Sequence, residues 1–250
     1  MKQHLSALIY SGLWTALDWV FPPECAACGE PGYRVCLDCQ RKIRFITQWE
    51  ANQGGKDQLT ELSKHKRQNF IPTSCSDSRH LAHYEGVIRE CLHSLKYDEN
   101  RGLGELFARW LVPLINDAGW GIDLVIAVPL SDQRYRERGY NQSALIAKPL
   151  AAQLGVPYNA YGLKRVLNTP SQVGLSAEER RRNVAKAFFA KEVIVSSKTV
   201  LLVDDVMTTG STLSACADAL LIGGTKTVYA VTVGRHIDKT QAISLNRHQV

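Results

Sequence analysis

Two adjacent carboxylates and a run of small hydroxyl residues lie in the segment VLLVDDVMTTGSTL, residues 200–213. Residues 200–203 have the composition of a buried strand. The acidic pair Asp204 and Asp205 is expected in the turn that follows this strand. The next residues form a hydroxyl- and glycine-rich loop that leads into an apolar helical pattern, namely Thr208, Thr209, Gly210, Ser211 and Thr212. In open α/β sheets, ligands bind beyond the carboxyl ends of such strands.

The chemistry of this loop favours a phosphate. The N-terminus of a helix has free N–H groups and a positive dipole end, and the hydroxyls add further donors. Gly210 has no Cβ, so the backbone can close around phosphate oxygens. The two carboxylates would repel a phosphate and suit sugar hydroxyls or a magnesium ion instead. The segment therefore predicts a sugar-phosphate site. The alternative is an acidic turn with an ordinary Thr/Ser helix cap.

The segment resembles the PRPP-binding motif of the type I phosphoribosyltransferases. The resemblance implies that the two aspartates hold the ribose 2′- and 3′-hydroxyls, that residues 208–212 hold the 5′-phosphate, and that magnesium accompanies PRPP. In such an enzyme, arginines would neutralise the pyrophosphate, and the candidates are Arg134, Arg136, Arg138, Arg180 and Arg181. Some relatives have an acid at the position of Thr208, so no general base is assigned in this loop.

Four of the seven cysteines form two CxxC pairs, Cys25 with Cys28 and Cys36 with Cys39. Each pair can hold one side of a tetrahedral metal, and four thiolates leave no coordination position open, so structural zinc is favoured. An iron–sulfur cluster and a redox CxxC are the alternatives. A tight cluster within an odd total argues against a disulfide framework and for a reducing compartment, the cytoplasm. Cys75 is interpreted as an unpaired thiol.

The whole chain has the composition of a soluble globular protein, with 45% hydrophobic and 22% charged residues. Its 250 residues allow one sizeable domain and a small one. The formal charge of +6 favours anionic partners without establishing nucleic-acid binding. Residues 5–20 have the spacing of an amphipathic helix, interpreted as a docking helix. A signal peptide is the alternative, although Asp18 interrupts the apolar stretch, and no stable membrane insertion is expected.

Periodicity divides the chain into residues 1–46 with the N-terminal helix and the zinc module, a polar linker or insert at 47–80, and a third unit at 81–250. In this third unit, the pattern predicts elements around a loop rich in arginine at 130–140 and a long loop at 168–183, which could close as a flap. The predicted helices cover 84–97, 103–114 and 141–154, and the predicted strands cover 122–128, 161–167, 187–190, 193–195, 200–203 and 228–233. Pro149 is expected to kink or break its helix. Lys96 is either a solvated helix-end residue or a phosphate ligand.

With these segments in order, the chain resembles the ComF family, which includes GntX-like proteins. The resemblance rests on FPPECAACG, CLDC, YEGVIRECLHSLKY, VPLSDQRYRERGYNQS, SQVGLSAEERRRNVAKAF and VLLVDDVMTTGST. It implies an α/β fold: a type I phosphoribosyltransferase-like parallel sheet with helices on both faces, plus a small N-terminal zinc-binding module. Similar chains often have further cysteine pairs after the first cluster. Here only Cys75 remains in that region, so one metal site is predicted.

Some members of this family are linked to natural transformation. The resemblance therefore implies binding of PRPP or another phosphorylated ribose, with single-stranded DNA and DNA-uptake or recombination proteins as further partners. The acceptor of a phosphoribosyl transfer is not specified by any motif. A non-catalytic module that binds single-stranded DNA is the rival hypothesis. A scaffold that docks a partner through the N-terminal helix is a third.

Overall fold

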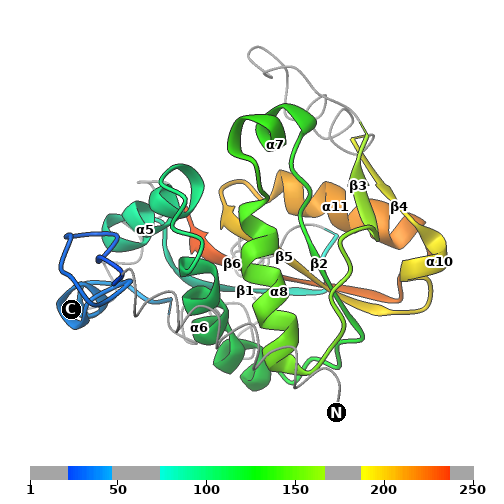
Figure 1. The fold of residues 1–250 in the computed structure, drawn as a ribbon. Helices are drawn as coiled ribbons and strands as arrows, with labels where there is room; N and C mark the ends of the chain where they lie inside the picture. Colours follow the sequence, from blue (N-terminus) through cyan, green and yellow to red (C-terminus); the bar gives the residue numbers. More distant parts are fainter. Residues whose placement is uncertain (1–21, 47–73, 167–186, 237–250) are drawn as a thin grey trace.

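A four-stranded parallel sheet lies at the centre of the protein (Figure 1). The computed structural model describes residues 22–46, 74–166 and 187–236. The strand order is β1–β6–β5–β2, and each neighbouring pair is parallel. The strands are β1 (Asp77–His83), β2 (Leu124–Ala127), β5 (Thr199–Met207) and β6 (Thr227–Arg235). All four carboxyl ends therefore lie at one edge of the sheet.

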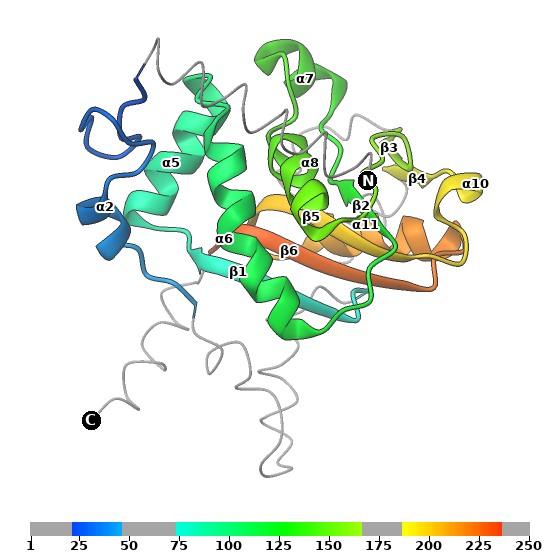
Figure 2. The ribbon, with the colours of Figure 1, turned by 60° about the horizontal axis from the view of Figure 1, so that its bottom comes forward.

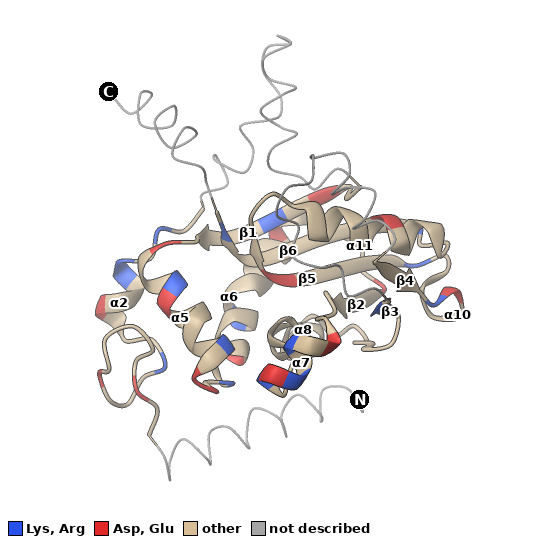
Figure 3. Cartoon of the chain, turned by 90° about the horizontal axis from the view of Figure 1, so that it is seen from above, with Lys and Arg blue, Asp and Glu red and all other residues tan. Residues whose placement is uncertain are grey.

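Side chains alternate between two apolar cores along the central strand, as expected for a parallel sheet covered on both faces. Leu201 and Val203 pack with three long helices, whereas Val200 and Leu202 belong to the core on the opposite face, where a single long helix packs. The three helices are α5 (Gly86–Tyr97), α6 (Leu103–Ala118) and α8 (Gln142–Leu154), and the single one is α11 (Ser211–Ile222). Figure 3 shows the sheet between them. The predicted fold class is confirmed.

Strand β1 is the main difference from the sequence prediction. Residues 77–80 were predicted in the linker and residue 83 near the start of a helix, but together they form the edge strand of the sheet. The predicted domain boundary at residue 81 therefore falls inside a strand. The polarity of this segment explains the error: Ser78 and His80 are buried, and the His80 ring nitrogens contact the hydroxyls of Ser78 and Thr232.

Four smaller elements also differ from the prediction. The predicted loop at 130–140 contains helix α7 (Asp132–Arg138), whose N-terminus is capped by the hydroxyl of Ser131. The segments β3 (Leu163–Arg165) and β4 (Phe188–Ala190) pair antiparallel in a separate small sheet. The predicted strand at 193–195 is part of helix α10 (Glu192–Val195), because its backbone forms local helical hydrogen bonds instead of a ladder.

Helix α8 passes through Pro149 without a break and ends at the predicted Gly155, whose N–H binds the carbonyls of Ala151 and Ala152. Of the predicted kink or break at Pro149, the break is therefore wrong. No helix in the described parts of the chain is long and apolar enough to cross a lipid bilayer. The predicted docking helix, the predicted flap, and Arg180 and Arg181 lie outside the described residues.

The N-terminal cysteine module packs directly on the α5–α6 side of the sheet (Figure 2). Its short helix α2 (Leu37–Arg41) is followed by a segment that runs antiparallel to β1, where the Ile46 N–H donates to the Leu81 carbonyl at 3.0 Å. Arg34 donates to Asn100 Oδ1 at 3.3 Å and so contacts the turn after α5. Because Val35 and Ile43 belong to the same core as α5 and α6, the module and the sheet share one hydrophobic core.

Candidate functional site

The acidic pair lies inside β5, near the carboxyl edge of the sheet. Strand β5 extends to Met207, which pairs with Arg235 of β6, so Asp204 and Asp205 are ladder residues and not turn residues. The prediction of an acidic turn is therefore wrong, because the strand ends four residues later than predicted. As neighbours in a strand, the two carboxylates start toward opposite faces. Both are buried, with 8% and 5% exposure.

The two carboxylate oxygens of Asp205 contact different side chains, one through a hydrogen bond and the other through an ion pair. Gln142 Nε2 donates to its Oδ1 at 2.9 Å, and Lys96 Nζ forms an ion pair with its Oδ2. Lys96 is in the last turn of α5, and its side chain is 18% exposed. Lys96 therefore faces the acidic pair and is not a solvated helix-end residue.

Asp204 receives two hydrogen bonds on a single oxygen. The Ser143 hydroxyl donates to its Oδ1 at 2.8 Å, and the backbone N–H of Asp205 donates to the same atom at 2.9 Å. Burial, and then the neighbouring charge of Asp205, raise the pKa of the Asp204 carboxyl well above its ordinary value. Burial, and then the charge of Asp204, raise the pKa of the Cys216 thiol in α11.

The residues that support this acidic pair were missed by sequence reasoning, although the segment RGYNQS that contains them had been singled out. Asn141 caps α8 by accepting the Ser143 N–H at 2.9 Å, and its Nδ2 donates to the Val128 carbonyl at 2.9 Å. These two bonds fix the start of α8 against the end of β2, so that Gln142 and Ser143 point at β5. A usable signal was present: consecutive polar residues open a helix that follows the carboxyl end of a buried strand.

The same segment also holds the end of α5 in place. The Tyr140 hydroxyl donates to the Leu95 carbonyl at 2.6 Å. The Arg138 guanidinium lies over the Tyr97 ring, 5.1 Å from its centroid, and donates to Gln142 Oε1. Each residue on either side of Lys96 is therefore tied to RGYNQS.

The three candidate arginines that the structure describes do not converge on the acidic pair. Arg134 and Arg136 are exposed on α7, which follows the carboxyl end of β2. Burial, followed by the charge of Arg134, lowers the pKa of Arg165, so Arg134 lies toward β3. Arg138 reaches the acidic pair only through Gln142.

The predicted phosphate loop lies between β5 and α11, at the same edge of the sheet. Gly210 has φ +75° and precedes the helix directly, a conformation that a residue with a Cβ adopts only with strain. Thr208, Thr209 and Thr212 are exposed, and the hydroxyls of Thr209 and Ser211 lie 2.7 Å apart. The loop therefore presents hydroxyls at the N-terminus of a 12-residue helix.

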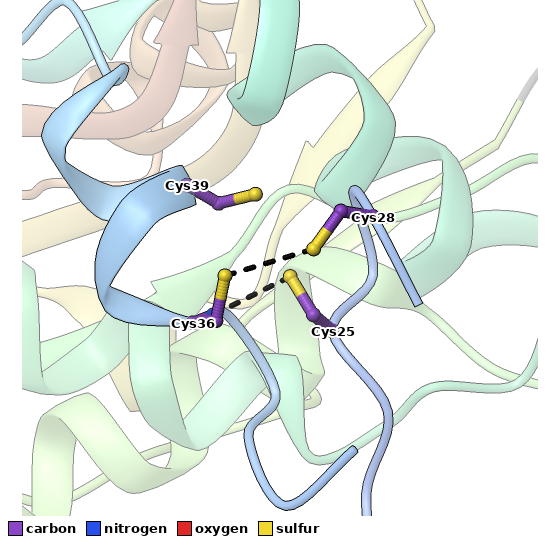
Figure 4. Close-up of side chains that lie close together, drawn as sticks. All are labelled: Cys25, Cys28, Cys36 and Cys39. Carbon is purple, nitrogen blue, oxygen red and sulfur yellow. Dashed lines mark hydrogen bonds between the residues drawn. The ribbon is translucent and has the colours of Figure 1, made fainter. Parts of the chain in front are cut away.

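The four clustered cysteines form a compact donor set (Figure 4). Their Sγ atoms all lie within 4.8 Å of one another, and those of Cys28 and Cys36 are 3.6 Å apart. Zinc–sulfur bonds of about 2.3 Å in a tetrahedron place sulfurs about 3.8 Å apart, so this set fits zinc. Burial acts to raise the pKa of the Cys25 thiol, but backbone N–H donors led by Cys36 outweigh it and lower the pKa to about 6. Among the described residues, this is the one cluster with metal-ligand geometry.

Comparison with known proteins agrees with this architecture. Residues 95–246 match the family model for the phosphoribosyl transferase domain, and residues 16–59 match the double zinc ribbon domain. These matches define the class of the protein. It has an N-terminal zinc-ribbon module with a structural zinc site, followed in the sequence by a phosphoribosyl transferase domain. The chain belongs to the ComF family within this class.

The relatives are named for DNA use and competence. The DNA utilization protein YhgH of Salmonella typhimurium is 31% identical over 82% of this chain and 80% of its own length. Competence protein F of Haemophilus influenzae is 35% identical over 56% of this chain and 64% of its own. A solved structure of the allosteric regulatory enzyme of purine biosynthesis covers 56% of this chain and 26% of its own, with 23% identity and a TM-score of 0.35, and supports no functional conclusion.

The raised pKa of Asp204 predicts that Asp204→Asn stabilises the free protein at neutral pH. The unfolded carboxyl ionises above pH about 3.9, whereas burial opposes ionisation in the fold, so the carboxyl costs stability as the pH rises from there. Each unit of upward pKa shift costs about 1.4 kcal/mol, or about 2–4 °C in Tm. Thermal melts at several pH values test this: the advantage of Asp204→Asn should grow with pH.

Asp205→Asn provides the contrast. It removes the charge that pairs with Lys96, so its Tm should fall. A stability difference between Asp204→Asn and wild type that does not change with pH would contradict the assignment of a raised pKa to Asp204.

Proposed function

We propose that this chain binds PRPP or a related sugar phosphate, with magnesium, at the carboxyl end of β5, and that it serves DNA uptake in natural transformation. The observation that carries the proposal is the buried acidic pair itself. Ser143 and Gln142 each donate to one of its carboxylates, and a threonine- and glycine-rich loop follows it directly. A buried carboxyl with a raised pKa, such as that of Asp204, is typical of a binding site.

The geometry suits a sugar phosphate in two parts. Carboxylate oxygens of Asp204 and Asp205 accept hydrogen bonds from vicinal hydroxyls, and the loop at 208–212 offers hydroxyls and helix N–H groups to a terminal phosphate. The two parts are joined by only two residues, so one ligand of ribose size can contact both. Magnesium would bind through the ligand's phosphates and nearby carboxylate oxygens, and it would supply positive charge to the pyrophosphate.

The part in DNA uptake rests on the relatives. Two of them are named competence proteins, in Haemophilus influenzae and Streptococcus pneumoniae, and a third is named for DNA utilization. A protein that binds PRPP in that setting connects the handling of incoming DNA with nucleotide supply.

Calorimetric titration of PRPP with magnesium tests the binding site. Wild type should give saturable heat, and the double variant Asp204→Asn/Asp205→Asn should give none, because the diol acceptors have lost their charge. Asp38→Asn is the matched control, since Asp38 is exposed on the zinc module and pairs only with Arg41 among the described residues. Equal heats from wild type and the double variant would reject the proposed site.

A non-catalytic module for single-stranded DNA is the second candidate function. The Tyr97 ring is 63% exposed and carries the Arg138 guanidinium, an arrangement suited to stacking a base beside a phosphate. This candidate would be favoured if wild type gave no heat with PRPP but bound single-stranded DNA with steep salt dependence, since phosphate contacts release counterions.

A further inference from the structure

The ion pair with Lys96 occupies a carboxylate oxygen of Asp205 that the proposed function needs for the ribose diol. Gln142 donates to one oxygen of Asp205 and Lys96 pairs with the other. If a ribose diol is to bind Asp205, it must replace one of these two donors. The free protein therefore holds this part of the proposed site occupied by its own side chains.

Gln142 is the donor that stays. Its amide is held at both ends, since Nε2 donates to Asp205 and Oε1 accepts from Arg138. Its backbone is at the first turn of α8, directly after the capping residue Asn141. Moving the Gln142 amide would break both of these side-chain hydrogen bonds, a cost of about 1 kcal/mol or more for each.

Lys96 is the donor that can move. Its ammonium is at the end of a flexible four-carbon stem. Because 18% of the side chain is exposed, the ammonium can move away from Asp205 toward solvent. The backbone around it need not follow. The Leu95 carbonyl is held by Tyr140 and the Tyr97 ring by Arg138, so the end of α5 is anchored on both sides of Lys96.

The chemistry of the ligand provides a new partner for the displaced ammonium. In PRPP, the carbon that carries the 2′-hydroxyl is bonded to the carbon that carries the pyrophosphate. If the 2′-hydroxyl displaces the Lys96 ammonium from Asp205, a change of the Lys96 rotamer can therefore bring the ammonium to the pyrophosphate. A partly buried charge is costly without a partner, and a phosphate oxygen is a strong acceptor for it.

We infer that Lys96 is an exchangeable partner of the sugar-phosphate site: it pairs with Asp205 in the free protein and moves to the pyrophosphate when PRPP binds. The inference rests on the proposed function and deepens it, because it makes the site selective. A ribose phosphate without pyrophosphate must break the ion pair and leaves Lys96 without a new partner. PRPP breaks the same pair and replaces it.

Lys96→Met tests this inference with two ligands, PRPP and ribose 5-phosphate, each titrated with magnesium by calorimetry. Methionine keeps an unbranched apolar stem and removes the charge. The variant should bind ribose 5-phosphate more tightly than wild type, since Asp205 is no longer paired with Lys96. PRPP gains less from the same change, because in wild type it replaces the broken ion pair by a phosphate contact. The ratio of PRPP affinity to ribose 5-phosphate affinity should therefore fall about tenfold or more. Lys96→Arg should recover much of this preference for PRPP.

Arg89→Met is the matched control, because Arg89 is on the same helix but pairs at the surface with Glu90. It should leave both affinities unchanged. Near-ultraviolet circular dichroism and Tm must show that Lys96→Met is folded, and Lys96→Arg provides the second variant if it is not.

The two ligands separate the possible failures. If wild type binds PRPP and Lys96→Met leaves the ratio of PRPP affinity to ribose 5-phosphate affinity unchanged or raises it, this inference is overturned and the proposed function stands. If folded wild type binds neither ligand, the proposed function is rejected and the inference with it. A lower ratio in Lys96→Met, restored by Lys96→Arg, supports the exchange.

Discussion

Replacing Cys25 by serine is expected to remove the metal and to unfold the N-terminal module, residues 22–46. The module has few apolar contacts of its own: apart from the bonds of residues 44 and 46 to β1, its backbone bonds are local turns around Cys25 and Cys36, and its core residues pack on α5 and α6. A structural zinc site supplies about 10–16 kcal/mol in zinc-finger peptides, far more than this module could recover by packing. We expect purified Cys25→Ser to contain little zinc, to melt at a lower temperature and to be cleaved by protease within the module.

Elemental analysis and limited proteolysis measure this directly. Cys75→Ser is the matched control: Cys75 is a buried thiol in the opposite core, and burial raises its pKa to about 12, so it has no thiolate to offer. Cys75→Ser should retain the full zinc content. If the wild-type protein contained iron and showed visible charge-transfer absorption, the site would be assigned to an iron–sulfur cluster and not to zinc. Unchanged zinc and proteolysis in Cys25→Ser would reject the assignment.

Gly104→Ala is expected to destabilise the protein by about 1–3 kcal/mol, even though alanine is the better helix former. Helices α6 and α8 approach so closely here that a Cβ on Gly104 would lie 2.8 Å from the carbonyl carbon of Leu145 and closer still to its oxygen. The obstacle is backbone, so no rotamer change relieves it. Helix α8 would have to shift, and Leu145 is only two residues from Ser143.

Thermal melts and PRPP calorimetry together test this second prediction. Tm should fall by several degrees, and PRPP binding should weaken because Gln142 and Ser143 move with α8. Gly121→Ala is the control: a Cβ there meets nothing within 4 Å. Equal stability of Gly104→Ala and wild type would show that the two helices are not in close contact at this position.

The parts of this protein that depend on neighbouring residues could be predicted from its sequence. The order of strand, acidic pair, hydroxyl loop and helix is local, and so is the spacing of the two CxxC pairs. Helices α5 and α6 were found from apolar residues repeated at helical spacing, because burial of one face dictates that repeat. Family resemblance supplied the meaning of the acidic pair, which periodicity alone could not.

Only the tertiary structure decided which side chains meet that pair. Ser143 and Gln142 are 61 and 63 residues from their aspartates in the chain, and Lys96 comes from a third element, α5. No spacing rule connects positions so far apart; the parallel sheet does so by placing the end of β2, the start of α8 and the end of β5 at one edge. Strand β1 was missed for the same reason, since its buried His80 contacts Thr232 of β6, which is distant in sequence.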